Sequence, residues 1–305
     1  MGAGLCRRST FVDSKVFDSE KIINFTKFFD RQVRTIVKTL NIMKIIRIAS
    51  AAMFSVLMTA FVSCCDRTPA AVAVPAVIPV QLDSVAADGP SEISIVAEVP
   101  VDTVSALSKA IGEYVSETLG GTWEGSCVDF DGMLDHYVSV LSETYSGMFE
   151  GLPADEVRCL DDVKIVKYAE SGKYVTYFVT HDLYLGGAHG SQMLGGVTFR
   201  KSDGRRIGWD VFTGQYDDNF AGLLKDGLKE YWHITSDSEL RTYFLDENDY
   251  YSMPRPECPP LFTADGVMVV YNEYEIAAYA CGRPSFTIPY DEIEDYMMVT
   301  AKKLL

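Results

Sequence analysis

The residues best suited to chemistry in this sequence form the run Gly186-Gly187-Ala188-His189-Gly190. Glycine has access to positive φ and lets other groups approach the main chain closely, so the run is typical of a tight loop or of a place where a ligand meets the backbone. His189 is the one side chain in the run that titrates near neutral pH. A single histidine can be a functional group or a hydrogen-bonded structural one, and both interpretations stay open for His189. No Lys-Ser or Lys-Thr pair follows the glycines, which excludes a phosphate-binding loop.

Other catalytic arrangements have less support. The four histidines include no pair at the spacing of a helical zinc site, and only His181, Asp182 and His189 could converge across a loop. A serine nucleophile would need the pattern Gly-x-Ser-x-Gly, which the sequence lacks. We therefore predict a protein that is not an enzyme and that uses neither a metal nor another cofactor. A hydrolase in which His189 works with Asp182 is the alternative.

A second reactive position lies at the end of an export signal. From Met43 the chain has two basic residues, then an apolar run of 15 residues from Ile48 to Val62, then Ser63-Cys64. A membrane-spanning helix needs about 20 apolar residues, so this run predicts a signal peptide at residues 43–63. The end of the run resembles the lipobox of bacterial lipoproteins, which predicts cleavage before Cys64, lipidation of Cys64 and a place on the outer membrane, facing the periplasm or the cell surface.

The remaining cysteines suggest a disulfide. An envelope protein can form disulfides, and the four cysteines of the folded part allow three pairings. We favour Cys258 with Cys281, which would join a proline-rich loop to the segment after it. Free buried thiols are the alternative.

Charge indicates the class of partner. The whole chain contains 27 Lys and Arg and 43 Asp and Glu, of which residues 1–63 contain ten and four. The chain from Cys64 onward therefore has 17 basic and 39 acidic residues, a net charge of −22. Such a surface argues against nucleic acid, which is bound through Lys and Arg. It would attract basic proteins, although solubility alone would also account for it.

The elements that position these residues follow from hydrophobic periodicity. We expect strands at residues 93–97, 163–170, 174–182, 192–201, 207–211, 267–271 and 286–288, and helices at residues 104–119, 132–149, 220–231 and 290–305. Helices among antiparallel hairpins, without a regular βαβ order, define an α+β fold. The chain then divides into a mis-started or disordered extension (1–42), the signal (43–63), a tether (64–90), an N-terminal α+β portion (91–185) and a C-terminal domain (186–305).

Two motifs point to a family. Gly186-Gly187-Ala188-His189-Gly190 is followed by Tyr274-Glu275-Ile276-Ala277-Ala278-Tyr279-Ala280-Cys281-Gly282 and then by Phe286-Thr287-Ile288-Pro289-Tyr290. With the segment 204–212 between them, they make residues 91–300 resemble the C-terminal domain of RsiV-like proteins, which include a lysozyme-sensing anti-sigma factor and accessory regions of peptidoglycan deacetylases. The chain departs from the family at Ala278, where proline is usual.

The resemblance implies an extracytoplasmic α+β domain that binds a protein partner. The residues it assigns to the binding surface are Gly186, Gly187, His189, Tyr274, Glu275 and Tyr279, with the two tyrosines as aromatic anchors. We expect a lipid-anchored envelope protein that binds lysozyme or another basic envelope protein. A peptidoglycan-binding module, in which Trp123, Trp209 and Trp232 stack on sugars, is the alternative. The motifs could also serve only to set the fold.

Overall fold

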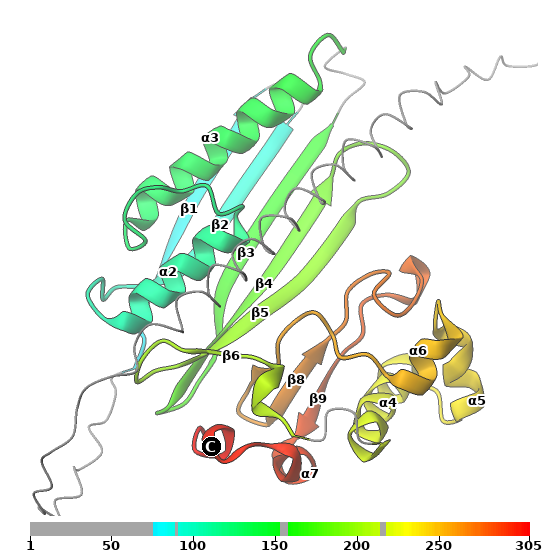
Figure 1. Ribbon diagram of the computed structural model, residues 1–305. Coiled ribbons are helices and arrows are strands. Elements are labelled where there is room, and N and C mark those ends of the chain that lie inside the picture. Colours follow the sequence, from blue (N-terminus) through cyan, green and yellow to red (C-terminus); the bar gives the residue numbers. More distant parts are fainter. Residues whose placement is uncertain (1–75, 89–90, 153–157, 214–217) are drawn as a thin grey trace, which may run out of the picture. The chain divides into compact units, whose positions relative to one another are not determined.

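The computed structural model describes residues 76–88, 91–152, 158–213 and 218–305, all within one compact unit that extends from Pro69 to Leu305 (Figure 1). The predicted extension (1–42), the signal (43–63) and the lipidation site at Cys64 lie outside the described residues. Within the described part, no helix is long and apolar enough to cross a membrane.

A six-stranded sheet forms the first half of the unit. Its strands are β1 (Pro79–Asp88), β2 (Ser91–Pro100), β3 (Cys159–Glu170), β4 (Tyr174–Tyr184), β5 (Ser191–Arg200) and β6 (Arg206–Ile207), in that order across the sheet. The β2–β3 pair is parallel and the other pairs are antiparallel. The alternation of side chains along the strand places one face of β2 in the core, since Ile93, Ile95 and Ala97 are buried while the residues between them are not.

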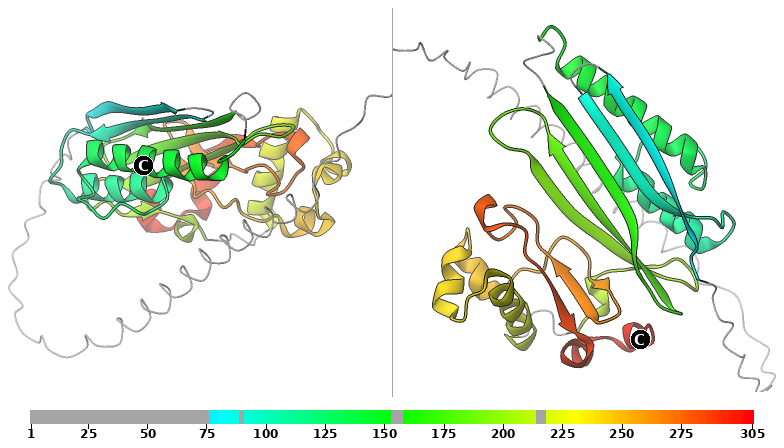
Figure 2. Two further views of the ribbon diagram at one scale, coloured as in Figure 1. Left: turned by 90° about the horizontal axis from the view of Figure 1, so that it is seen from above. Right: turned by 180° about the vertical axis from the view of Figure 1, so that it is seen from behind.

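Two helices cover one face of this sheet (Figure 2). Helix α2 (Ala106–Thr118) begins after Ser105, whose side chain accepts a hydrogen bond from the N–H of Ser108. Helix α3 (Phe130–Met148) begins after Asp129, which caps the N–H of Gly132 in the same way. Their apolar positions, spaced by three and four residues, pack on the sheet. The fold is therefore α+β, as the sequence predicts.

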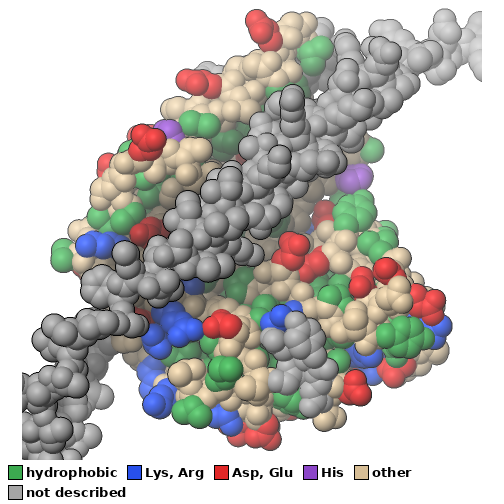
Figure 3. Space-filling model, in the orientation of Figure 1, with side chains coloured by type: hydrophobic (Ala, Val, Ile, Leu, Met, Phe, Trp, Pro, Cys, Tyr) green, Lys and Arg blue, Asp and Glu red, His purple; other side chains and the backbone are tan. Residues whose placement is uncertain are grey.

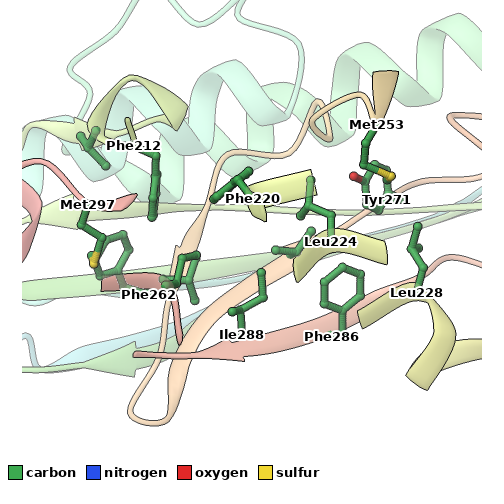
Figure 4. Close-up of a cluster of buried hydrophobic side chains, with 14 of the residues drawn as sticks. Phe212, Phe220, Leu224, Leu228, Met253, Phe262, Tyr271, Phe286, Ile288 and Met297 are labelled. Atoms are coloured by element: carbon green, nitrogen blue, oxygen red, sulfur yellow. The ribbon is translucent and has the colours of Figure 1, made fainter. Parts of the chain in front are cut away.

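The second half of the unit is built around a small antiparallel sheet. It contains β7 (Leu261–Phe262), β8 (Gly266–Val270) and β9 (Ser285–Pro289), together with η1 (Trp209–Val211), α4 (Asp218–Trp232), α5 (Asp237–Leu240), η2 (Arg241–Tyr243), α6 (Glu247–Ser252), η3 (Tyr279–Cys281), α7 (Tyr290–Ile293), η4 (Glu294–Tyr296) and α8 (Val299–Lys302). Side chains from distant segments meet in its core, among them Phe212, Phe220, Phe262 and Met297 (Figure 4). Aromatic side chains supply much of this buried area.

Four expectations are wrong in part. The strand predicted at residues 207–211 is limited to β6, which ends at Ile207, because Trp209–Val211 form the 3-10 helix η1. The tether predicted for residues 64–90 contains β1, an edge strand defined by backbone pairing with β2 from Pro79↔Pro100 to Asp88↔Ser91. The boundary between residues 185 and 186 falls in the loop joining β4 and β5, two strands of one sheet. The helix predicted for residues 290–305 is interrupted at Met297, which is extended because Met297 and Met298 pair with Phe212 and Val211.

Candidate binding site

The glycine-rich run forms the loop between β4 and β5. Gly186 and Gly187 both have positive φ, 90° and 96°, and neither has another atom within 4 Å of the place where a Cβ would lie. These two glycines are needed for backbone conformation, because no neighbour demands their small size. Tyr184 fixes the loop by donating a hydrogen bond from its hydroxyl to the carbonyl of Gly187, 3.1 Å away. His189 is exposed, and its Nδ1 lies 2.8 Å from the carbonyl oxygen of Gly190.

The second motif forms the connection between β8 and β9. Tyr274 has a φ of 64°, a left-handed conformation that is uncommon for a bulky residue. Strained residues of this kind often occur at functional sites, where the surroundings hold them in place. Here the N–H of Tyr274 donates to the carbonyl of Ala277, at 3.1 Å. Tyr279 begins η3 a few residues later.

The two motifs meet in a stack of rings. The His189 ring lies on the Tyr279 ring with centroids 4.2 Å apart and planes at 28°, and Tyr279 is also stacked with Tyr274 at 6.2 Å and 30°. Tyr274 is 58% exposed and Tyr279 36%. We call His189, Tyr274 and Tyr279 the aromatic triad. The aromatic triad presents flat ring surfaces to solvent. It brings together residues that are distant in sequence, since 85 positions separate His189 from Tyr274.

A polar cleft of about 420 Å³ opens beside the aromatic triad. Its lining includes Tyr279 and three acidic side chains, Asp162, Asp182 and Glu273. Asp162 on β3 and Asp182 on β4 are directly opposite in register, an arrangement that is unfavourable for like charges. Lys164 forms an ion pair with Asp162 at 2.5 Å, and both carboxylates raise the pKa of its ammonium group. Arg283 also lines the cleft, and the remaining polar groups come from the ends of β4 and β5.

Glu275 does not belong to the exposed surface. One of its carboxylate oxygens accepts from the N–H of Asn272 at 2.8 Å and the other from the N–H of Glu257 at 2.6 Å. Burial raises its pKa, and these two N–H groups lower it by less, so the net shift is upward. The carboxylate of Glu275 therefore holds the loop that carries Tyr274, and the binding role expected for Glu275 stays a prediction.

Asn272 fastens this loop to the large sheet. Its side-chain amide donates to the carbonyl of Leu194 at 2.9 Å, and its Oδ1 accepts from the N–H of the same residue at 2.8 Å. The amide thus pairs with the backbone of β5 as another strand would. Arg283 and Glu273 form an ion pair close by, with the Glu273 side chain almost fully buried. These contacts explain how segments far apart in sequence hold the aromatic triad together.

The predicted disulfide is absent from the described structure. Cys258 and Cys281 are both free thiols. Cys258 is buried beside Leu261 and Val270, and this burial raises its pKa to about 12. Packing against apolar neighbours keeps this thiol protonated and unreactive.

A separate polar cluster lies under α3. The hydroxyl of Tyr145 donates to one oxygen of the buried Asp161 at 2.5 Å, and Nε2 of His181 is 2.7 Å from the other oxygen. Burial is the main cause that raises the pKa of Tyr145 well above its usual value. The cluster connects α3 to β3 and β4. The hydrolase alternative would pair His189 with Asp182. In the structure Asp182 accepts a hydrogen bond from the side-chain amide of Gln192 at 2.5 Å, and Nδ1 of His189 lies beside the carbonyl oxygen of Gly190.

The tryptophans of the carbohydrate alternative are structural. Each indole N–H donates to a backbone carbonyl: Trp123 to Ser126, Trp209 to Pro256 and Cys258, and Trp232 to Cys281. All three are packed against a hydrophobic core. As for metals, the described residues contain no group of three or more His, Cys, Asp and Glu side chains arranged to hold an ion.

The cleft was not predicted from the sequence. Asp162 and Asp182 face each other across β3 and β4, but a β-bulge between Lys167 and Ala169 shifts the register of this hairpin by one residue. Counting outward from the Ser171-Gly172 turn would have placed Leu183 opposite Asp162, so the facing carboxylates could not have been predicted in this way. Arg283 and Glu273 gave no signal, because their pairing depends on the path of the chain between β8 and β9.

Comparisons with known proteins agree with the fold. Residues 210–291 match a family described as "Protein of unknown function (DUF3298)". A crystal structure of a DUF3298 family member from Bacteroides fragilis superposes with a TM-score of 0.53 at 20% identity, covering 72% of this chain and 92% of that one. A DUF3298 family protein from Pseudomonas aeruginosa gives 0.52 at 14% identity, with coverages of 74% and 96%. No curated protein matches this sequence.

The matched segment contains η1, α4 and the small sheet, and it carries the Tyr274–Tyr279 part of the aromatic triad. The structural matches extend beyond it to most of the chain. Residues 210–291 of this chain are therefore similar to the DUF3298 family, and the fold is shared with the two solved family members.

Proposed function

We propose that this chain is a lipid-anchored protein of the bacterial cell envelope that binds a basic protein partner, with lysozyme as the sharpest candidate. The observation that carries the proposal is the meeting of two distant motifs in the exposed aromatic triad, beside a cleft lined with carboxylates. The RsiV-like resemblance and the DUF3298 match supply the family context. Lipidation of Cys64 supplies the anchor.

The chemistry of the site suits cationic side chains. An Arg or Lys side chain can lie over an aromatic ring, an interaction of about 0.5–2 kcal/mol, while its charge faces a carboxylate. Tyr279 lines the same cleft as Asp162 and Asp182, so one inserted side chain would meet both kinds of group. The net charge of −22 from Cys64 onward would speed the approach of a basic partner.

Binding to hen-type lysozyme tests the proposal. The fragment Pro69–Leu305 is suitable because it retains β1, whereas a fragment that starts at Ser91 would expose the backbone of β2. We expect saturable binding that weakens at high salt. Tyr279→Ala should weaken it by about tenfold or more, as expected for a central aromatic anchor. Tyr251→Ala is the matched control, because Tyr251 is an exposed tyrosine on α6.

A second candidate function is binding of peptidoglycan fragments. The stacked and exposed rings of Tyr274 and Tyr279 favour it, since flat aromatic surface also suits the faces of sugar rings. Salt distinguishes the two candidates: muropeptide binding should survive high salt, while a charge-steered protein complex should weaken. Failure of the fragment to bind or inhibit lysozyme at low salt would remove the first candidate.

A further inference from the structure

An exposed apolar patch surrounds the place where the described chain begins. Ile78, Val101 and Val104 are 69%, 60% and 79% exposed, which is unusual for three large aliphatic side chains so close together. The N–H of Val101 donates to the carbonyl of Ile78 at 3.0 Å, so the start of the described chain and the end of β2 lie side by side. We call these three residues the entry patch.

A groove of about 430 Å³ continues the entry patch inward. Most of the residues that line the groove are apolar, and the polar ones are Asp102, Ser105, Ser108 and Lys201. Lys201 is buried and forms an ion pair with Glu170 at 2.7 Å. The groove therefore offers apolar surface open to the same side as the entry patch.

The entry patch is held firmly in place. The N–H of Val77 donates to Glu170 at 2.7 Å, and the carbonyl of Val77 accepts from the ammonium group of Lys167 at 2.8 Å. Lys167 and Glu170 also pair with each other at 3.0 Å. Both backbone groups of one residue are thus fixed to the end of β3, so the patch has a defined orientation on the sheet.

The surroundings of the patch differ in charge from the rest of the chain. The three segments around it, residues 98–117, 167–174 and 200–210, together contain seven Lys and Arg and seven Asp and Glu. Lys and Arg side chains gather near β6 and the start of α2 (Figure 3). The net charge of −22 therefore lies outside these segments, and this end of the molecule has no net charge to repel an anionic surface.

The length of chain before the patch limits its distance from the anchor. Ala76 lies twelve residues after Cys64. A fully extended chain of that length spans about 40 Å at most. A lipid on Cys64 would keep the entry patch within that distance of the bilayer, and exposed aliphatic side chains bind at the boundary between head groups and acyl chains.

We propose that the entry patch is a membrane-contact surface that lies on the bilayer around the lipid anchor. This inference rests on the proposed lipidation of Cys64. The strands β3, β4 and β5 run from the patch to the loop of residues 185–190, and the 11 residues of β4 extend about 35 Å. The aromatic triad is thereby held away from the membrane, where it can reach a partner.

Tryptophan quenching by brominated lipids tests the contact. The full chain is produced in a bacterium that acylates lipoproteins, its mass is measured, and it is placed in vesicles of phosphatidylethanolamine and phosphatidylglycerol. Val104→Trp should add emission that brominated acyl chains quench. Met148→Trp is the matched control, because Met148 is exposed at the end of α3, which leads to the opposite end of the sheet, and it should add no such quenching.

A second measurement is independent of the anchor. The fragment Pro69–Leu305, which lacks both the apolar run of the signal and Cys64, should bind the same vesicles weakly, and Val101→Asp with Val104→Asp should reduce that binding by about tenfold or more. Leu245→Asp, at a similarly exposed leucine far from the patch in sequence, should leave it unchanged. All these positions are exposed, so the thermal stability of the variants should match that of the parent.

The outcomes are distinct. An unacylated mass would overturn the proposed anchor, while vesicle binding by the Pro69–Leu305 fragment that is lost with Val101→Asp and Val104→Asp would still support the membrane-contact surface. An acylated chain in which Val104→Trp shows no lipid quenching overturns the inference. Blue-shifted emission of the Val104→Trp variant in solution, before vesicles are added, would also overturn the inference. It would mean that the chain itself or a second copy covers the entry patch.

Discussion

Glu170, at the end of β3, links Val77, which precedes β1, to the large sheet. Burial on its own would raise the pKa of Glu170, but Lys201, the N–H of Val77 and Lys167 together lower it below its ordinary value of 4.5. Since the folded-state pKa is depressed, the carboxylate stabilises the fold above about pH 4.5, and this stabilisation is lost as the pH falls through the folded-state pKa.

Glu170→Gln should therefore lower the free energy of unfolding by about 2 kcal/mol at neutral pH, the range for hydrogen bonds to charged groups. The difference from the parent should shrink as the pH falls below 4.5 and through the lowered folded-state pKa, because the parent carboxyl becomes protonated too. Urea titrations at a series of pH values from neutral downward measure it. A difference that does not change with pH would mean that packing, and not charge, is what Glu170 contributes.

Two buried tyrosines of the same core should respond in opposite ways to loss of the hydroxyl. Among the described residues, the Tyr177 hydroxyl is buried without a hydrogen-bond partner, whereas that of Tyr137 bonds Ser116 and the N–H groups of Thr122 and Trp123 at 2.8–3.0 Å. A buried hydroxyl without a partner costs about 1–3 kcal/mol. Tyr177→Phe should thus leave the thermal midpoint unchanged or higher, and Tyr137→Phe should lower it. Equal losses in both variants would contradict this assignment.

Among the elements, those that bury one face were predictable. Helices α2 and α3 and the hairpin of β3 and β4 lie close to their expected positions, because apolar residues follow each period. Strand β1 is defined by its backbone pairing with β2, and the break at Met297 arises from pairing with Phe212, more than 80 residues earlier. Neither pairing leaves a periodic pattern in the local sequence, so neither could be predicted from it. The stacking of the aromatic triad could not be predicted either, because His189 lies in the β4–β5 loop while Tyr274 and Tyr279 lie between β8 and β9.

One glycine of the large sheet lies in close contact both with the neighbouring strand and with the small sheet. A Cβ at Gly196 of β5 would lie 2.5 Å from the carbonyl oxygen of Tyr177 and 3.0 Å from the side chain of Leu261 on β7. The neighbouring Gly195 has nothing within 4 Å of that position. Gly196→Ala should therefore lower the free energy of unfolding by about 1–3 kcal/mol through overpacking. Gly195→Ala is the control and should have little effect; chemical denaturation compares the two, and equal stabilities would refute the close approach.

On the scale of the whole molecule, charge is unevenly distributed along the chain from Cys64 onward. The segments around the entry patch are balanced, and the excess of Asp and Glu lies elsewhere, including the cleft beside the aromatic triad. A protein with this arrangement would face an anionic membrane with its neutral end and a basic partner with its acidic cleft. Like charges at this density also repel each other within the folded chain, which lowers its stability at low salt.

Salt should consequently have opposite effects on folding and on partner binding. Raising the ionic strength from about 0.01 M to about 1 M shortens the Debye length from about 30 Å to about 3 Å, which screens both the internal repulsion and the attraction to a basic partner. The thermal midpoint of the Pro69–Leu305 fragment should rise while its affinity for lysozyme falls. Calorimetry and binding measured in the same buffers test this directly. If both quantities fell together, the loss of binding would reflect a destabilised fold, and charge steering would not account for it.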